Sequence, residues 1–188
     1  MSIPAKVTAY LTKAKVQFDV IAHRTVFTAY DLASTLREKL ETIGKTLLVK
    51  ADKRYVLVVL PANRRVDLAK LKTVLQAKKI TIATENDMVR ELKVKPGAIT
   101  PFGTLHKLEV VVDATLLKAK SILLGAGSFT ESLRLKVKDF VKIENAKLAR
   151  FTTDAGFPRP PAAKSKKPVR RLTKRPRKKI AKRKPTKR

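Results

Sequence analysis

Cysteine is absent from this chain of 188 residues. Its absence excludes a disulfide framework, a zinc site built on thiolates and a cysteine nucleophile. The sequence has only two histidines, and it contains no G-x-S-x-G, H-E-x-x-H, Walker or G-x-G-x-x-G motif. No familiar serine-hydrolase, zinc-protease or nucleotide-binding site is therefore indicated, and we expect neither a metal nor a cofactor.

Long hydrophobic runs are also missing. The longest apolar stretch covers about residues 55–60, whereas a membrane-spanning helix needs about 18 apolar residues. Residues 1–17 lack the uninterrupted apolar segment of a signal peptide. We therefore expect a soluble, cytoplasmic protein.

Acidic residues do not occur in the C-terminal segment, residues 158–188. All 15 Asp and Glu residues lie at or before Asp154, whereas this segment holds 16 of the 44 Lys and Arg residues and 6 of the 10 prolines. Such a segment cannot bury enough apolar surface to offset the entropy lost on ordering. We therefore predict a folded domain in residues 1–157 and a disordered basic tail in residues 158–188.

The net charge of +29 points to an anionic partner. Extended clusters of charge bind phosphates without the geometry that reads bases, so we predict nonspecific nucleic-acid binding through the tail. No amphipathic apolar face accompanies the charge, which argues against a membrane partner. The predicted contacts come from Arg170, Arg171, Lys174, Arg175, Arg177, Lys178, Lys179, Lys182, Arg183 and Lys184.

The first 157 residues alternate between helical and strand patterns. Capping residues Thr28, Asp67 and Thr84 predict three helix starts, the first running with an apolar face to Leu40 and the third followed by Met88, Val89 and Leu92. A further helix is predicted near the N-terminus and another at 139–146. Predicted strands cover 18–21, 46–50, 55–60, 108–112, 122–124 and 132–137, and the third is apolar on both faces, which predicts a central position. The pattern indicates the α/β class, a single domain with a mixed sheet surrounded by helices.

Four short motifs stand at the ends of predicted strands. Lys45 opens an apolar strand within Gly-Lys-Thr-Leu-Leu-Val, and residues 97–103 read Gly-Ala-Ile-Thr-Pro-Phe-Gly. Val-Val-Asp ends a strand at Asp113, and Gly-Ala-Gly-Ser follows at 125–128. In this order and spacing the motifs resemble the YbaK/prolyl-tRNA synthetase-associated editing domain family, over roughly residues 16–146.

The resemblance implies a YbaK-like fold and an aminoacyl-tRNA deacylase that hydrolyses the ester of mischarged tRNA in trans, of the Ala- or Cys-tRNA(Pro) type. Mischarged tRNA is the implied partner, and an aminoacyl-tRNA synthetase or elongation factor is a further candidate. Lys45 is implied as the functional residue, because a fixed ammonium can hold a terminal phosphate or carbonyl and stabilise developing charge. Without the resemblance, Lys45 is better interpreted as a solvated lysine at a strand edge.

The same resemblance implies a set of substrate-binding residues. Glycines would allow close approach of the backbone to the ester, whereas Phe102 either lines the amino-acid pocket or fills the core, and His23 either borders the pocket or lies on the surface. The set comprises His23, Thr28, Gly97, Pro101, Phe102, Gly103, Gly125 and Gly127.

The chain also departs from the family pattern. Many members have a serine where Gly125 stands and an acidic residue near Ser132, which leaves the amino-acid specificity open. A second function is therefore kept: a non-catalytic nucleic-acid-binding protein with a degenerate editing domain and a basic tail. Release of amino acid from mischarged tRNA distinguishes the two.

Overall fold

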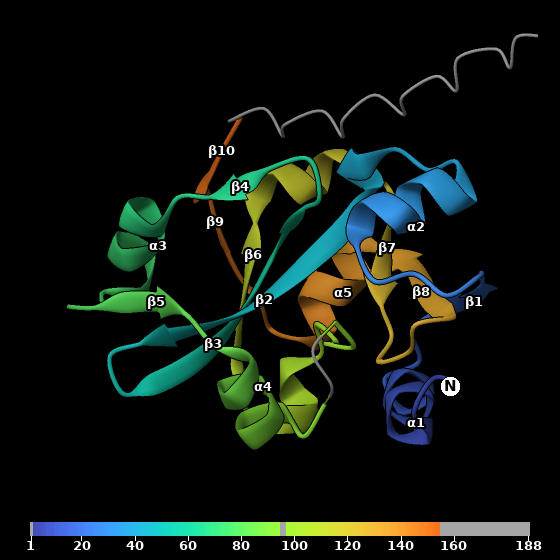
Figure 1. The fold of residues 1–188 in the computed structure, drawn as a ribbon, viewed down its shortest axis with the longest axis horizontal. Helices are drawn as coiled ribbons and strands as arrows, with labels where there is room; N and C mark the ends of the chain where they lie inside the picture. The colour runs from blue at the N-terminus through green and yellow to red at the C-terminus, as the bar shows by residue number, and fades with distance from the viewer. Residues whose placement is uncertain (1, 95–96, 155–188) are drawn as a thin grey trace, which may run out of the picture. The chain divides into compact units, whose positions relative to one another are not determined.

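The computed structural model describes residues 2–94 and 97–154. Within them a mixed sheet is covered by helices on both faces, as the sequence predicts (Figure 1). The helices are α1 (Ala5–Lys13), α2 (Ala29–Leu36), α3 (Leu68–Leu75), α4 (Glu85–Leu92) and α5 (Val137–Ile143). The strands are β1 (Phe18–Ala22), β2 (Ile43–Ala51), β3 (Arg54–Pro61), β4 (Arg65–Val66), β5 (Ile80–Ile82), β6 (Glu109–Asp113), β7 (Ser121–Gly125), β8 (Glu131–Lys136), β9 (Lys147–Ala149) and β10 (Thr152–Thr153).

The three predicted caps start the helices. The Thr28 side chain accepts a hydrogen bond from the Asp31 N–H, and the Asp67 side chain accepts one from Lys70. At α4 both halves of a capping box are present, between Thr84 and Asp87. Each cap satisfies an N–H group that would otherwise lack a partner in the first turn.

The main sheet has the strand order β1-β8-β7-β2-β3-β6-β9, with β5 paired to β2 outside this path. β3 is antiparallel to β2 and parallel to β6, and its residues from Val56 to Pro61 are buried. The central position predicted for this strand is therefore confirmed. β4 and β10 form a separate two-stranded sheet.

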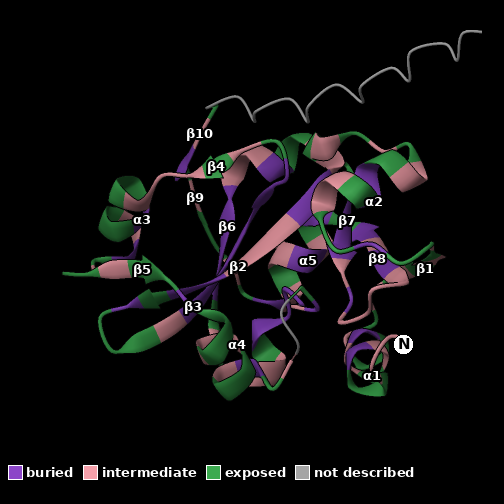
Figure 2. Cartoon of the chain, in the orientation of Figure 1, coloured by how far each residue is buried: buried purple, intermediate pink, exposed green. Residues whose placement is uncertain are grey.

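Buried residues run along the central strands of the sheet (Figure 2), and their side chains form three clusters. One face carries the largest cluster, in which Leu48, Leu57 and Leu124 pack with residues of α1 and α5. The other face has two clusters, one around α3 that includes Val49 and one around α2 that includes Ile43. Because Lys45 and Leu47 fall between Ile43 and Val49 on the strand, they lie between these two clusters.

One edge of β2 is shared between two partner strands. On that edge it pairs with β7 only at Ile43 and Gly44, and with β5 only from Val49 to Ala51. Its other edge is paired with β3 along the full strand. Between the two short pairings, one edge of β2 is left open to a pocket.

Several predicted boundaries were wrong. α2 ends at Leu36, because Arg37 adopts a left-handed conformation with φ of 55°, and Leu40 belongs to a short 3-10 turn. The closing helix covers 137–143 instead of 139–146, so Val137 leaves the preceding strand. Of the apolar residues after the Thr84 cap, Leu92 is buried and Val89 is 51% exposed. In the described ranges no helix is long and apolar enough to cross a membrane.

Asp113, at the end of β6, fastens the last described strand to the sheet. Its fully buried carboxylate accepts hydrogen bonds from the Thr115 N–H and hydroxyl and, at 3.1 Å, from the Phe151 N–H. The Phe151 carbonyl accepts the Asp67 N–H at 2.8 Å, and the Phe151 side chain is buried in the cluster around α3. Asp113 therefore caps the turn after β6 and holds the backbone at Phe151 next to the sheet, and it does not line the pocket.

We predict that Asp113→Ala lowers the free energy of unfolding by about 2–4 kcal/mol, because it leaves buried N–H donors without an acceptor. Urea denaturation measures this loss. Asp19→Ala, at an exposed position of β1, is the control and should change stability by less than about 0.5 kcal/mol. Equal losses in the free energy of unfolding for the two substitutions would contradict the stabilising role of the Asp113 carboxylate.

Candidate functional site

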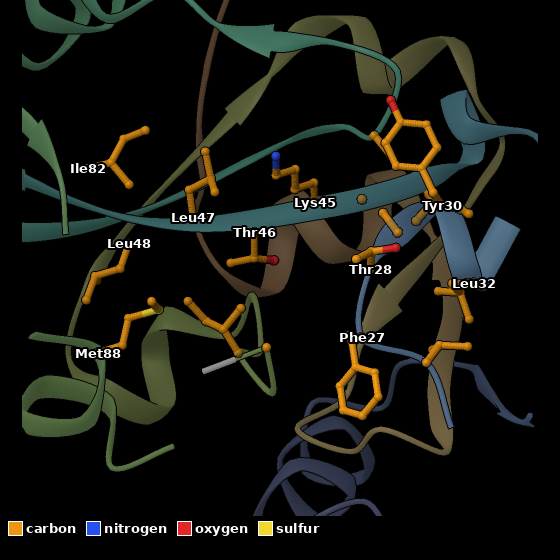
Figure 3. Close-up of a pocket in the computed structure, with 18 of the residues that line it drawn as sticks. Phe27, Thr28, Tyr30, Leu32, Lys45, Thr46, Leu47, Leu48, Ile82 and Met88 are labelled. Carbon is orange, nitrogen blue, oxygen red and sulfur yellow. The ribbon is translucent and has the colours of Figure 1, made fainter. Parts of the chain in front are cut away.

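A pocket of about 470 Å³ opens at the divided edge of β2 (Figure 3). Its walls come from the segment that leads into α2, from β2, from β5 and α4, and from the loop at 97–99. The lining is mostly apolar. It consists of Val26, Phe27, Thr28, Ala29, Tyr30, Leu32, Ile43, Gly44, Lys45, Thr46, Leu47, Leu48, Ala62, Ile82, Ala83, Met88, Gly97, Ile99 and Gly125.

Lys45 supplies the positive charge of this lining. Its side chain points to the same side of β2 as Leu47, whereas Thr46 and Leu48 point to the opposite side (Figure 3). Lys45 is half-buried. Burial, and after it the charge of Arg65, lowers the pKa of the Lys45 ammonium below its usual value.

A second cation lies close to this end of the pocket. Arg65 belongs to β4, is exposed, and acts electrostatically on both Lys45 and Tyr30. Burial raises the pKa of the Tyr30 hydroxyl, and the charge of Arg65 opposes that rise. None of the described lining residues is Asp, Glu, His or Cys, so this end of the pocket favours an anionic group.

The open edge of β2 also presents main-chain groups. The Ala83 N–H donates to the Leu48 carbonyl at 2.9 Å, so the main-chain groups of Leu48 face this edge. Because strand residues alternate, Thr46 directs its N–H and carbonyl to the same edge. In the described part of the chain neither β7 nor β5 pairs with Thr46. A donor and an acceptor are thus available at the pocket, between Lys45 and the loop at 97–99.

Four predicted site residues meet here. Lys45, Thr28, Gly97 and Gly125 all line the pocket. Gly97 has a φ of +86°, and a Cβ there would lie 3.1 Å from the Phe129 ring, so a side chain would be strained at this position. The Thr28 hydroxyl donates to the Asp31 carboxylate at 2.8 Å while it caps α2, which fixes it on the pocket wall.

Other predicted site residues lie elsewhere. Phe102 is fully buried in the core and makes edge-on ring contacts with Tyr10 and Phe140. Of the two roles left open for it, core packing is the one its position supports. Gly103 packs against the Leu108 carbonyl, where a Cβ would come within 2.4 Å. It therefore serves backbone packing, and a substitution there would disturb the fold first.

Three further predictions also fall outside the lining. Pro101 is buried, and Gly127, with a φ of +79°, packs against the Pro4 ring. The imidazole of His23 contacts the Arg24 carbonyl at 2.8 Å and the Ser132 hydroxyl at 2.9 Å. The tail residues predicted to bind nucleic acid, from Arg170 to Lys184, lie outside the described residues.

Sequence reasoning missed several lining residues, among them Phe27, Tyr30, Thr46 and Ile82. Tyr30 lies two residues after the predicted cap Thr28, and Thr46 directly follows Lys45. Both could have been found by including the sequence neighbours of the predicted site residues. The sequence around Ile82 gives no such indication, because Ile82 reaches the pocket only through the pairing of β5 with β2. In residues 2–94 and 97–154 no cluster of three or more His, Cys, Asp or Glu could hold a metal ion.

Comparisons with known proteins agree with this architecture. A family model described as an aminoacyl-tRNA editing domain matches residues 23–143. The prolyl-tRNA editing protein ProX of Acetoanaerobium sticklandii is 28% identical over 154 residues, which cover 78% of this chain and 94% of that protein. The multifunctional Ser/Thr-tRNA deacylase ProXp-y of Escherichia coli K12 is 25% identical over 155 residues, covering 80% and 93%.

A solved structure, described as that of a proposed trans-editing enzyme for prolyl-tRNA synthetase, shares the fold. It matches with a TM-score of 0.69 and 19% identity, over 81% of this chain and 99% of that one. The family model covers the pocket, including Lys45, Thr46 and Gly97. The chain belongs to the aminoacyl-tRNA editing domain family.

Proposed function

We propose that this protein is a deacylase that hydrolyses the ester bond of mischarged aminoacyl-tRNA in trans. The observation that carries the proposal is the placement of Lys45, half-buried in a pocket whose described lining has no carboxylate, beside Thr46, with which neither β5 nor β7 pairs in the described part of the chain. The experiment that tests it is release of free amino acid from a panel of mischarged tRNAs by the purified protein.

Water is the proposed nucleophile. Its oxygen bonds to the ester carbonyl carbon, and the carbonyl oxygen becomes negative in the tetrahedral intermediate. The bond from that carbon to the ribose oxygen then breaks, and the ribose oxygen takes a proton that the attacking water brought. The products are the amino acid and a tRNA with a free terminal hydroxyl.

Each pocket group has a part in this reaction. The Lys45 ammonium stabilises negative charge, either on the terminal phosphate or on the developing oxyanion, and in a water-poor site such stabilisation is large. The Thr46 carbonyl accepts from the α-ammonium of the amino acid, and the Thr46 N–H or a main-chain group near Gly97 donates to the ester. No step needs a metal, and addition of a chelator is expected to leave the rate unchanged.

The pocket size and lining favour a small, uncharged amino acid. Residue 125 is glycine, and any Cβ there would approach the Ile99 carbonyl to 2.9 Å, so no side chain contributes polar contacts at this wall. With Leu48, Ile82 and Met88, the lining suits an Ala or Cys side chain. Since ProX is named for prolyl-tRNA editing and ProXp-y for Ser- and Thr-tRNA, the panel should include Ala-, Cys-, Ser- and Thr-tRNAs, with tRNA(Pro) as the proposed carrier in the cytoplasm.

We predict that Lys45→Met lowers kcat/KM by about 10²–10³-fold, because it keeps the apolar stem and removes the charge. Single-turnover hydrolysis of Ala-tRNA(Pro) gives the rate, and urea denaturation is expected to show a change below about 0.5 kcal/mol. Lys50→Ala, an exposed position on the same strand, is the matched control. Near-wild-type hydrolysis by Lys45→Met would remove Lys45 from the mechanism, whereas the non-catalytic alternative predicts that the wild type itself releases no amino acid.

The lowered pKa of Lys45 gives the activity a pH dependence. Only the protonated ammonium stabilises negative charge, so the enzymatic rate falls as pH rises through this pKa. Arg65→Gln removes the second cause of the lowering, so the pKa rises and the descending limb moves to higher pH. The pH profile of kcat, corrected for spontaneous ester hydrolysis, measures the shift.

Lys13→Gln is the control for that measurement. It removes one positive charge from an exposed position on α1, which does not line the pocket. Its profile should match that of the wild type. A descending limb that stays in place in Arg65→Gln would mean that another group controls it.

The basic segment from 158 to 188 is proposed as a disordered tail that adds general tRNA affinity to a catalytic domain in residues 1–157. Its 16 Lys and Arg residues would act through counterion release, which has a slope of about −0.7 to −0.9 in log K against log salt for each phosphate contacted. If about six groups engage at once, truncation flattens the slope by about 4–5.

We predict that removing residues 158–188 weakens tRNA binding equally for matched and unrelated tRNAs, because phosphate contacts carry no sequence information. A salt titration of affinity measures both the loss and the slope. A tail of the same composition in scrambled order is the matched control and should restore binding. A slope unaffected by truncation would rule the tail out as the binding element.

A further inference from the structure

Phe27 is the most exposed large hydrophobic side chain of the described residues, at 69%, and it lies on the lining of the pocket. A single exposed hydrophobic residue is ordinary on a protein surface. Phe27 differs because its ring has an aromatic neighbour and because its backbone is fixed on both sides. Figure 3 shows its ring on the opposite side of β2 from Lys45.

The aromatic neighbour is Phe129. The two ring centroids are 5.3 Å apart, with an interplanar angle of 50°. The Val26 N–H donates to the Phe129 carbonyl at 2.9 Å, which joins the two segments next to the rings. Val26 itself is buried, and Thr28 caps α2. The Phe27 ring is therefore presented on a rigid support instead of on a loose loop.

Gly97 completes this part of the rim. Its absent side chain leaves room for Phe129, whose ring would lie 3.1 Å from a Cβ, and the Phe27 carbonyl would lie 4.0 Å from it. The two rings thus lie directly beside the loop that borders the ester position. A flat apolar group attached close to the ester would reach the exposed ring of Phe27 when the ester enters the pocket.

The 3′-terminal nucleotide of a charged tRNA carries such a group. Its ribose bears the aminoacyl ester, the base and the 5′ phosphate within one nucleotide. With the ester at Thr46 and the phosphate at the cationic end formed by Lys45 and Arg65, the base is left for the opposite side of the pocket. Exposed aromatic rings bind bases by stacking, which is favourable for any base because each has a π-face.

We propose that Phe27, supported by Phe129, is a stacking platform for the 3′-terminal base of the tRNA substrate. This inference rests on the proposed function for the identity of the substrate. It makes Phe27 a substrate-binding residue that aligns the ester with the open edge of β2. Stacking is lost when either the ring or the base is removed, so the two losses are not additive.

The first test is a double-mutant cycle on hydrolysis of Ala-tRNA(Pro). Phe27→Ala is expected to lower kcat/KM about 10-fold, within the range given by loss of one stacked base. A tRNA with an abasic 3′-terminal ribose should show a similar loss with the wild-type protein and little further loss with Phe27→Ala. Phe27→Trp should retain activity, whereas Phe27→Leu, which is apolar without a π-face, should behave like Phe27→Ala.

The second test does not need hydrolysis. The probe is tRNA(Pro) with 2-aminopurine as its terminal base, whose fluorescence is quenched on stacking. Wild-type protein should quench it, Phe27→Ala should not, and Val89→Ala, at an exposed position outside the pocket lining, should quench as the wild type does. Thermal unfolding of Phe27→Ala should match the wild type, because the ring is exposed.

The outcomes separate the two proposals. Suppose the wild type hydrolyses the ester and Phe27→Ala lowers kcat/KM equally on normal and abasic tRNA. That result overturns the stacking platform and leaves the deacylase in place. Hydrolysis together with quenching that persists in Phe27→Ala has the same meaning. Quenching that depends on Phe27 without hydrolysis of any mischarged tRNA overturns the deacylase and leaves the platform. The absence of both activity and quenching overturns both.

Discussion

The pairing of β2 decides where this protein has a pocket. One edge of the strand is covered by β3 from end to end, whereas the other edge is shared between β7 and β5. β7 runs parallel to β2 and β5 runs antiparallel to it, and on that edge neither pairs with Thr46 in the described structure. An open stretch of strand normally invites pairing with another chain. Here the stretch is recessed between α2, α4 and the loop at 97–99, so a small extended ligand can reach it more easily than another strand can.

The same division explains the environment of Lys45. The face of the sheet that carries it has two separate buried clusters, around α2 and around α3. A lysine within either cluster would need to be neutral or paired. Between them it is half-buried, so that burial, and after it the charge of Arg65, lowers the pKa of its ammonium. The charge that favours an anionic substrate is therefore maintained by the geometry of the sheet and the spacing of two helices.

Local signals in the sequence were sufficient for the helix starts and for the central strand. Thr28, Asp67 and Thr84 are recognised because a cap depends on residues three positions apart. The strands β4, β5, β9 and β10 were missed, because two or three residues are too few to show a period of two. Since β5 forms one wall of the pocket, that omission also hid Ile82.

The glycines of one motif show a second limit of sequence reasoning. Gly97 and Gly103 belong to the same loop and the same family-like pattern, yet Gly97 lines the pocket and Gly103 packs against the Leu108 carbonyl. The sequence carries the same residue type for both because both lack room for a side chain. The two glycines differ only in what excludes a side chain: the backbone next to β6 at Gly103, and the Phe129 ring at Gly97. Lys45, whose role stays a prediction, lines the pocket, and the motif that drew attention to it lies on the strand that forms the pocket wall.

A pocket with a cation and no described carboxylate also has a consequence for turnover. In the proposed reaction, the ester that enters is uncharged at its carbonyl, whereas the amino acid that leaves carries a new carboxylate. Lys45 attracts that product more strongly than it attracts the ester. In that proposed reaction, release of the amino acid becomes slower than cleavage of the ester when cleavage is fast. The partial exposure of Lys45 to water weakens this attraction, so the depth at which the lysine is buried balances stabilisation of the reacting group against retention of the product.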